Sequence, residues 1–186
     1  PVLSLVLLAA LPAAAARADR QMYPELRSVI AGAITPADCF EDKYEQAVWL
    51  AYMEPRLGRY VKDPGEREQI LHHVHCEAKR AELPPELVLA VMDVESRFNR
   101  YAVSSAGAVG LMQVMPFWPK ELGMSNSQLV RVSDNIRMGT TILSYYLRKE
   151  RGNYQRALQR YNGSLGRPTY SDLVIDRLLS RWRYDH

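Results

Sequence analysis

The 186-residue chain lacks the features that mark several large classes of protein. It has no uninterrupted run of like charge, and 24 Lys and Arg stand against 21 Asp and Glu, a balance that argues against a dedicated nucleic-acid binder. It has no internal repeat and no stretch in which apolar and polar residues alternate convincingly with a period of two. The composition therefore predicts an all-α protein with one compact core, or a core with a small appendage.

The chain also lacks an apolar run long enough to be assigned as a membrane span. Its most apolar segment, Pro1–Ala18, ends in the small-x-small sequence Ala16-Arg17-Ala18 that signal peptidases cut. We interpret the segment as an export signal whose charged start and initiator Met are missing, with a retained anchor as the alternative. No Cys follows the cleavage site, which argues against a lipid on the mature N-terminus. The mature protein is expected to be soluble.

Cysteine is scarce. In an exported protein the pair Cys39 and Cys76 predicts one disulfide, two buried free thiols being the alternative. His72, His73 and His75 stand beside Cys76, but neighbours on one helix cannot surround an ion and no second ligand pair is evident. We therefore predict no metal site.

The spacing of apolar residues predicts a series of helices. Pro55, followed by Gly58, is expected to end the helix Glu41–Glu54. Ser133 or Asp134 is expected to cap the helix Asp134–Glu150, and Gly163 to close the helix Asn153–Asn162. The predicted ranges are Glu41–Glu54, Glu66–Leu83, Pro85–Glu95, Asp134–Glu150, Asn153–Asn162 and Thr169–Arg183.

Two further segments frame these helices. Asp19–Asp38 has too little periodicity to assign beyond a short helix, and we interpret it as a linker or loosely packed arm. In the last predicted helix the inward face includes Tyr170 and Trp182, which are assigned to the core.

The third predicted helix carries an acid where a hydrophobic residue is expected. Glu95 shares one helix face with Val88, Val91 and Met92. A carboxyl on an apolar face loses hydration when it ionises, so its pKa rises and it can act as a general acid near neutral pH. The alternative is a Glu at a helix end that faces solvent or pairs with Arg97 or Arg100.

No partner carboxylate for Glu95 is evident. Retaining glycosidases normally place a second carboxylate across the sugar. Asp93 projects to the far side of the same helix, and Asp134 and Asp172 are better explained as helix starts. A lone acid points to a reaction in which the substrate supplies its own nucleophile.

Two short segments have the residue types of a sugar-binding site. Gly107–Gln113 allows close backbone approach to a ligand, Gln113 can hydrogen-bond sugar hydroxyls, and Met112 offers an apolar wall. The alternative is a Gly-rich turn before a packed helix. Tyr161 and Asn162 either add a phenol and an amide to that site or simply end a helix.

Together these segments resemble the lytic transglycosylases that share the catalytic domain of the soluble murein transglycosylases. That domain is α-helical and related to goose-type lysozyme. The resemblance covers about Leu83 to Trp182. It rests on Glu95-Ser96, on Ser104–Gln113 followed by Met115-Pro116, on Tyr161-Asn162-Gly163, and on the intervening Asn135-Ile136, Gly139 and Tyr146-Leu147.

The resemblance implies a role for each matched residue. Glu95 would be the single catalytic acid and base, and Ser96 would orient it or contact the sugar. Ser104, Met112 and Gln113 would line the glycan groove. Tyr161 would hydrogen-bond near the carboxyl or the N-acetyl group, with Asn162 beside it. Arg160 departs from the family, which usually has a small Ala there.

The resemblance also implies the domain order and the reaction. Residues 83–186 would form the catalytic domain, after a signal at 1–18 and a linker with a helical extension at 19–82. The reaction would cleave the β-1,4 bond between N-acetylmuramic acid and N-acetylglucosamine and leave 1,6-anhydro ends, without metal or organic cofactor.

The expected partners are peptidoglycan glycan strands and no nucleic acid, and the expected state is a periplasmic monomer. The N-terminal region would shield the groove, dock a cell-envelope protein or brace the fold. The alternatives are a lysozyme-type muramidase on the same fold and a non-catalytic peptidoglycan-binding component of a cell-wall-spanning secretion system.

Overall fold

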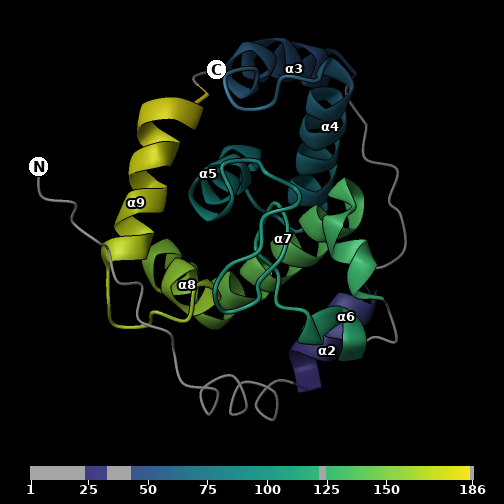
Figure 1. Cartoon of the computed structure of the whole chain (residues 1–186). Helices are drawn as coiled ribbons and strands as arrows, with labels where there is room; N and C mark the ends of the chain where they lie inside the picture. The colour runs from purple at the N-terminus through teal and green to yellow at the C-terminus, as the bar shows by residue number, and fades with distance from the viewer. Residues whose placement is uncertain (1–23, 33–42, 122–124, 185–186) are drawn as a thin grey trace, which may run out of the picture.

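The computed structural model describes residues 24–32, 43–121 and 125–184. Every regular element in these ranges is helical, and β-type pairing is limited to two isolated bridges, so the all-α prediction is confirmed (Figure 1). The elements are α2 (Pro24–Gly32), α3 (Lys43–Leu57), α4 (Pro64–Arg80), α5 (Pro85–Glu95), α6 (Phe117–Glu121), the 3-10 helix η1 (Asn126–Val130), α7 (Val132–Lys149), α8 (Tyr154–Tyr161), α9 (Thr169–Arg177) and the π-helical turn η2 (Leu178–Trp182).

Helix α5 forms the centre of the fold. All its residues from Leu87 to Asp93 are buried, and its neighbours are α4 and the continuous pair α9–η2. Pro85 occupies the first helical turn, where its missing N–H breaks no hydrogen bond. The predicted bounds Pro85–Glu95 are confirmed, and Glu95 is the last residue of the helix.

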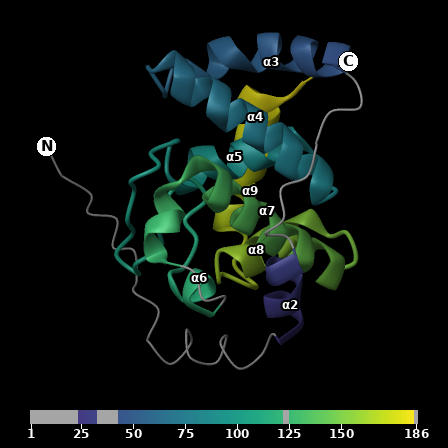
Figure 2. The same ribbon diagram turned by 90° about the vertical axis from the view of Figure 1, so that its right-hand side faces the viewer.

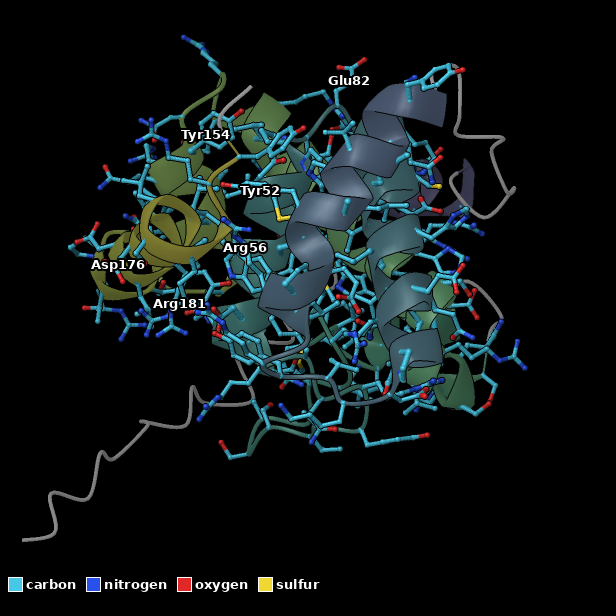
Figure 3. The ribbon with its side chains drawn as sticks, turned by 90° about the horizontal axis from the view of Figure 1, so that it is seen from above. Tyr52, Arg56, Glu82, Tyr154, Asp176 and Arg181 are labelled. Carbon is cyan, nitrogen blue, oxygen red and sulfur yellow. The ribbon has the colours of Figure 1, made fainter. Side chains whose placement is uncertain are left out.

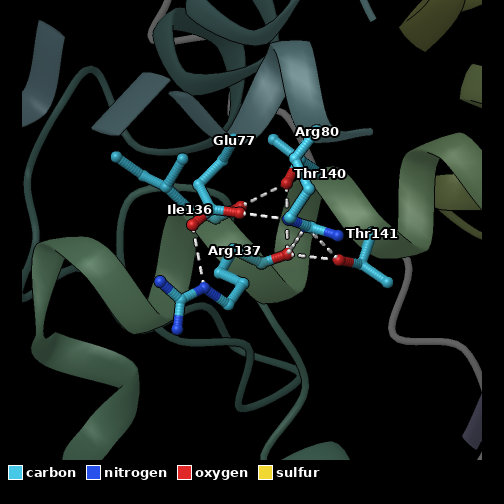
Figure 4. Close-up of polar contacts among 6 residues, drawn as sticks. All are labelled: Glu77, Arg80, Ile136, Arg137, Thr140 and Thr141. Carbon is cyan, nitrogen blue, oxygen red and sulfur yellow. Dashed lines mark hydrogen bonds and ion pairs between the residues drawn. The ribbon is translucent and has the colours of Figure 1, made fainter. Parts of the chain in front are cut away.

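An ion-pair cluster joins α4 to α7 (Figure 4). Glu77 is 4% exposed, and its two carboxylate oxygens accept hydrogen bonds from Arg80 Nε at 2.6 Å and Arg137 Nε at 2.8 Å. Arg80 Nη2 also donates to Thr141 Oγ1 at 2.6 Å. Because both oxygens of the buried carboxylate are bonded, the charge can remain in the interface.

The structure corrects several predicted helix boundaries. Helix α4 spans Pro64–Arg80, where Glu66–Leu83 was predicted. Helix α3 runs past Pro55 to Leu57, because the burial of Met53 and Leu57 offsets the one backbone hydrogen bond that a proline removes from the last turn. Helix α7 begins at Val132, and its N-cap is Arg131 without a side-chain hydrogen bond, so neither Ser133 nor Asp134 is the cap. Gly163, at φ +72°, follows α8 as predicted.

The interpretation of Asp19–Asp38 as a loosely packed arm is wrong for its described part. That part forms α2, which packs against α7 and buries Leu26 and Ile30 almost completely (Figure 2). Two apolar residues four apart are too short a pattern to predict a packed helix. Within the described ranges no helix is long and apolar enough to cross a membrane.

Candidate functional site

Glu95 lies at the C-terminal end of α5 and is partly buried. Burial raises its pKa from 4.5 to about 7, against the smaller lowering effect of a hydrogen bond from Tyr170. No other acidic side chain in the described ranges contributes to this shift. The expectation of a poorly hydrated carboxyl is therefore met, and near neutral pH Glu95 is populated in both its protonated and ionised forms.

Tyr170 is the closest described partner of Glu95. Its hydroxyl donates a hydrogen bond of 2.6 Å to Glu95 Oε1, from the first turn of α9. Burial, followed by the nearby charge of Glu95, holds the pKa of Tyr170 well above its usual range, so the phenol stays a donor. The sequence placed Tyr170 on an inward helix face, which gave no signal for this role.

The chain reverses sharply after α5. Arg97 and Phe98 have φ of +50° and +64°, a left-handed backbone conformation that is uncommon for residues other than glycine. Phe98 is buried against Tyr60 and Trp182, and this packing holds the strained turn. The turn brings the following loop back toward the end of α5.

Asn135 of α7 holds that loop. Its Oδ1 accepts from Met112 N at 2.8 Å, and its Nδ2 donates to Val109 O and Leu129 O. Gly110 is required beside it, because a Cβ there would lie 2.3 Å from Asn135 Nδ2. Sequence reasoning noted Asn135 only as part of the resemblance, since bonds between an amide and a distant backbone leave no local pattern.

Hydrogen bonds to backbone carbonyls bring the segment Glu95-Ser96 and the loop Gly107–Gln113 together. Ser96 Oγ donates to Leu111 O at 2.7 Å, which ties the end of α5 to the loop. Met112 is fully buried against Gly139, so its side chain supports the loop from behind and forms none of the exposed surface. Gln113 Nε2 donates to Ala102 O and Gly110 O.

Ser104 and Gln113 are both partly exposed, as a ligand-facing position requires. Ser104 Oγ accepts from Ala108 N at 3.0 Å, which closes the loop tip. Trp118, five residues after Gln113, is 8% exposed and packs on Phe117, so it offers little surface to a ligand. The other two tryptophans are core residues.

The segment Tyr161-Asn162 contacts the loop Gly107–Gln113. Tyr161 Oη donates to Met112 O at 2.7 Å, and burial, followed by the charge of Glu95, raises the pKa of Tyr161 well above its usual range. The direct bond to Glu95 thus comes from Tyr170. Asn162 is exposed at the C-cap of α8. Arg160 turns to Glu150 and forms an ion pair there.

The other acidic candidates lie apart from this chemistry. Asp93 is 4% exposed and accepts from Trp182 Nε1 at 3.0 Å and Tyr60 Oη at 3.2 Å. Asp134 and Asp172 lie in the first turns of α7 and α9, as predicted.

The described residues contain no group of three His, Cys, Asp or Glu side chains arranged to hold a metal ion. The histidines beside Cys76 lie along α4. Cys39 falls outside the described residues, so the disulfide to Cys76 stays a prediction.

Comparison with known proteins identifies relatives for the part of the chain that carries the site. The family model described as "Transglycosylase SLT domain" matches residues 73–169. Membrane-bound lytic murein transglycosylase C of Actinobacillus pleuropneumoniae serotype 5b is 56% identical over 48 residues, covering 26% of this chain and 13% of the relative. The protein of the same name from Yersinia enterocolitica is 35% identical over 109 residues, covering 50% and 30%.

Among solved structures, an inactive mutant of lytic transglycosylase Slt from Pseudomonas aeruginosa shares 31% identity. It matches 57% of this chain and 20% of its own, with a TM-score of 0.48. The chain thus spans less than a third of the length of each of these relatives. Tyr170 lies just beyond the residues that the family model matches.

Proposed function

Since the chain belongs to the transglycosylase SLT domain family, we propose that it is a peptidoglycan lytic transglycosylase. It cleaves the β-1,4 bond between N-acetylmuramic acid and N-acetylglucosamine and leaves 1,6-anhydro ends on the muramic acid. The observation that carries the proposal is Glu95, whose pKa of about 7 suits one group that first donates and then accepts a proton.

The proposed mechanism uses Glu95 twice. The protonated carboxyl gives its proton to the bridging oxygen, the glycosidic bond breaks, and the N-acetyl carbonyl of the muramic acid stabilises the positive charge at C1. The Glu95 carboxylate then takes the proton of the C6 hydroxyl, whose oxygen attacks C1 and closes the anhydro ring. Glu95 ends protonated, and no water is consumed.

The surroundings of Glu95 support this sequence of steps. Tyr170 donates to Oε1, which fixes the orientation of the carboxyl and stabilises its ionised form. No other acid in the part of the chain that the structure describes contributes to the pKa of Glu95, as expected where the nucleophile belongs to the substrate. Attack within one sugar ring has the proximity advantage of an intramolecular reaction.

In this proposal the remaining site residues bind the glycan. Ser96 joins the end of α5 to the loop, and Ser104 and Gln113 offer partly exposed polar groups to sugar hydroxyls. Asn162 lies exposed after Tyr161, and Met112 acts from behind as a packing residue.

The test is to digest purified peptidoglycan with the protein and to analyse the fragments by mass spectrometry. Anhydro ends are lighter than the reducing ends of a hydrolase by one water. We expect anhydro ends, and no release by Glu95→Gln. Glu68→Gln, at an exposed position of α4, is the matched control and should remain active.

Each other outcome has a definite meaning. Reducing ends would establish the muramidase alternative. Binding without release by the wild-type protein would establish the non-catalytic alternative.

The same family supports a location in the cell envelope, and two of the relatives are named membrane-bound. We propose the periplasm for this chain, with residues 83–186 as the catalytic domain and 19–82 as an extension. The contacts of α2 and α3 favour a bracing role for that extension.

A further inference from the structure

The basic side chains of this protein are unevenly distributed. Residues 148–167 contain six Lys and Arg and a single acid, a net charge of +5, whereas the whole chain has a net charge of +3. This segment covers the end of α7, the turn after it, all of α8 and the loop beyond (Figure 1). We call its basic residues the α7–α8 cationic surface; they are Arg148, Lys149, Arg151, Arg156, Arg160 and Arg167.

The surface is organised around its one acid. Glu150 forms ion pairs with both Arg156 and Arg160, and these contacts hold the pKa of Glu150 below its usual range. A single carboxylate therefore fixes two guanidinium groups in place and neutralises one of their two charges. Arg160, the residue that departs from the family pattern, is thus part of this surface.

Three of the remaining charges have no ion-pair partner among the described residues. Arg148, Arg151 and Arg167 are all exposed, and Arg148 is oriented by a hydrogen bond from Nη1 to Ser144 Oγ at 2.6 Å. Arg151 lies in the turn between α7 and α8, with φ of +52°. Guanidinium groups of this kind form two parallel hydrogen bonds with a carboxylate.

The cationic surface adjoins the candidate site. Helix α8 carries Arg156 in its first turn and Tyr161 at its last residue, so the two lie within one helix of eight residues, about 12 Å long. Tyr154, at the start of α8, is 43% exposed (labelled in Figure 3). Tyr161, next to Arg160, lies close enough to Glu95 for the charge of Glu95 to raise the pKa of Tyr161, after the larger effect of burial.

We infer that the α7–α8 cationic surface binds the free carboxylates of the stem peptides of peptidoglycan. The inference rests on the proposed function, which supplies a partner that carries carboxylates on every unprocessed muramic acid. The contact would select strands that still carry stem peptides over bare glycan.

The test measures binding of Glu95→Gln protein, which does not turn over substrate, to sedimented sacculi. Two preparations are compared: intact sacculi, and sacculi whose stem peptides have been removed by an amidase. The test variant adds Arg148→Gln, Arg151→Gln and Arg167→Gln. The control variant adds Arg27→Gln, Arg59→Gln and Lys120→Gln, which neutralise three exposed charges elsewhere.

We expect the test variant to bind intact sacculi about tenfold more weakly and with a smaller dependence on salt, because it loses three ion pairs with stem-peptide carboxylates. Its binding to bare glycan, and all binding by the control variant, should stay unchanged. Equal binding of both variants to intact sacculi would overturn the inference. A different pattern would also overturn the inference: binding to vesicles of anionic phospholipid that the three substitutions abolish, together with unchanged binding to intact sacculi.

The proposed function is tested separately by the products of the wild-type protein. If those products lack anhydro ends but the binding difference holds, the transglycosylase proposal fails and the stem-peptide surface stands.

Discussion

At the scale of single residues the proposed chemistry depends on Glu95 and on Tyr170, its hydrogen-bond donor among the described residues. Burial favours the protonated carboxyl and Tyr170 favours the ionised one, and the balance places the pKa of Glu95 at about 7. Neither effect requires another charged group. The site can therefore be adjusted by changing one neighbour.

The pH dependence of activity follows from this balance. In the proposed mechanism the first step needs protonated Glu95, so kcat/KM should fall as the pH rises through about 7. Tyr170→Phe removes the bond that lowers the pKa of Glu95, so the fall should move to higher pH, with a lower maximal rate because the carboxyl loses its orientation. Tyr154→Phe, at an exposed phenol, is the control. An unchanged pH profile in Tyr170→Phe would contradict this account.

Gly110 permits a second test at the residue scale, because Gly107 provides a matched comparison. Both have positive φ, +83° and +85°, but a Cβ at Gly110 would lie 2.4 Å from Leu129 O, whereas one at Gly107 would meet nothing within 4 Å. We expect Gly107→Ala to cost about 1 kcal/mol of unfolding free energy and Gly110→Ala about 3 kcal/mol or more. Urea denaturation measures both, and equal losses would show that Asn135 and Leu129 can move aside.

At the scale of elements, α9 and η2 form a strap across α5 that is attached near both ends. Tyr170 at the start of α9 bonds Glu95, and Trp182 at the end of η2 bonds Asp93. The Tyr60 hydroxyl, from the turn between α3 and α4, donates to the same oxygen of Asp93. Tyr60 also accepts a hydrogen bond from Arg181 of η2, so a residue that precedes α4 helps to hold the strap that carries Tyr170.

Removing the buried acid should loosen this strap. Asp93→Ala leaves Trp182 Nε1 buried without its acceptor, a cost of about 2 to 4 kcal/mol when the lost packing is included. Amide hydrogen exchange should accelerate in α9 and η2 before it does in α7. Asp176→Ala, at an exposed position of α9, should change stability by less than about 0.5 kcal/mol. Exchange that accelerates uniformly across the protein would refute the strap.

At the scale of the whole molecule, α2 belongs to the core. It lies more than 50 residues before the site in sequence and packs against α7, the helix that carries Asn135. The described fold is therefore larger than the region 73–169 that the family model matches.

The contribution of α2 can be measured with two adjacent residues. Ile30 is 1% exposed and Val29 is 37% exposed. Ile30→Ala should lower the unfolding free energy by about 2 to 4 kcal/mol, and Val29→Ala by well under 1 kcal/mol. Thermal and urea denaturation measure both losses. If both substitutions lowered the unfolding free energy by similarly small amounts, α2 would be dispensable for the fold.

The sequence by itself determined the helical class, the bounds of α5 and the acid on its apolar face, because these depend on local periodicity. It also indicated the motifs around Gly110 and Tyr161. It did not identify Tyr170 as the partner of Glu95, Asn135 as the support of the loop, or α2 as part of the core. Those facts depend on contacts between residues far apart in the chain. Only the tertiary structure decides which buried phenol meets the carboxyl and which loop carbonyls an amide side chain holds.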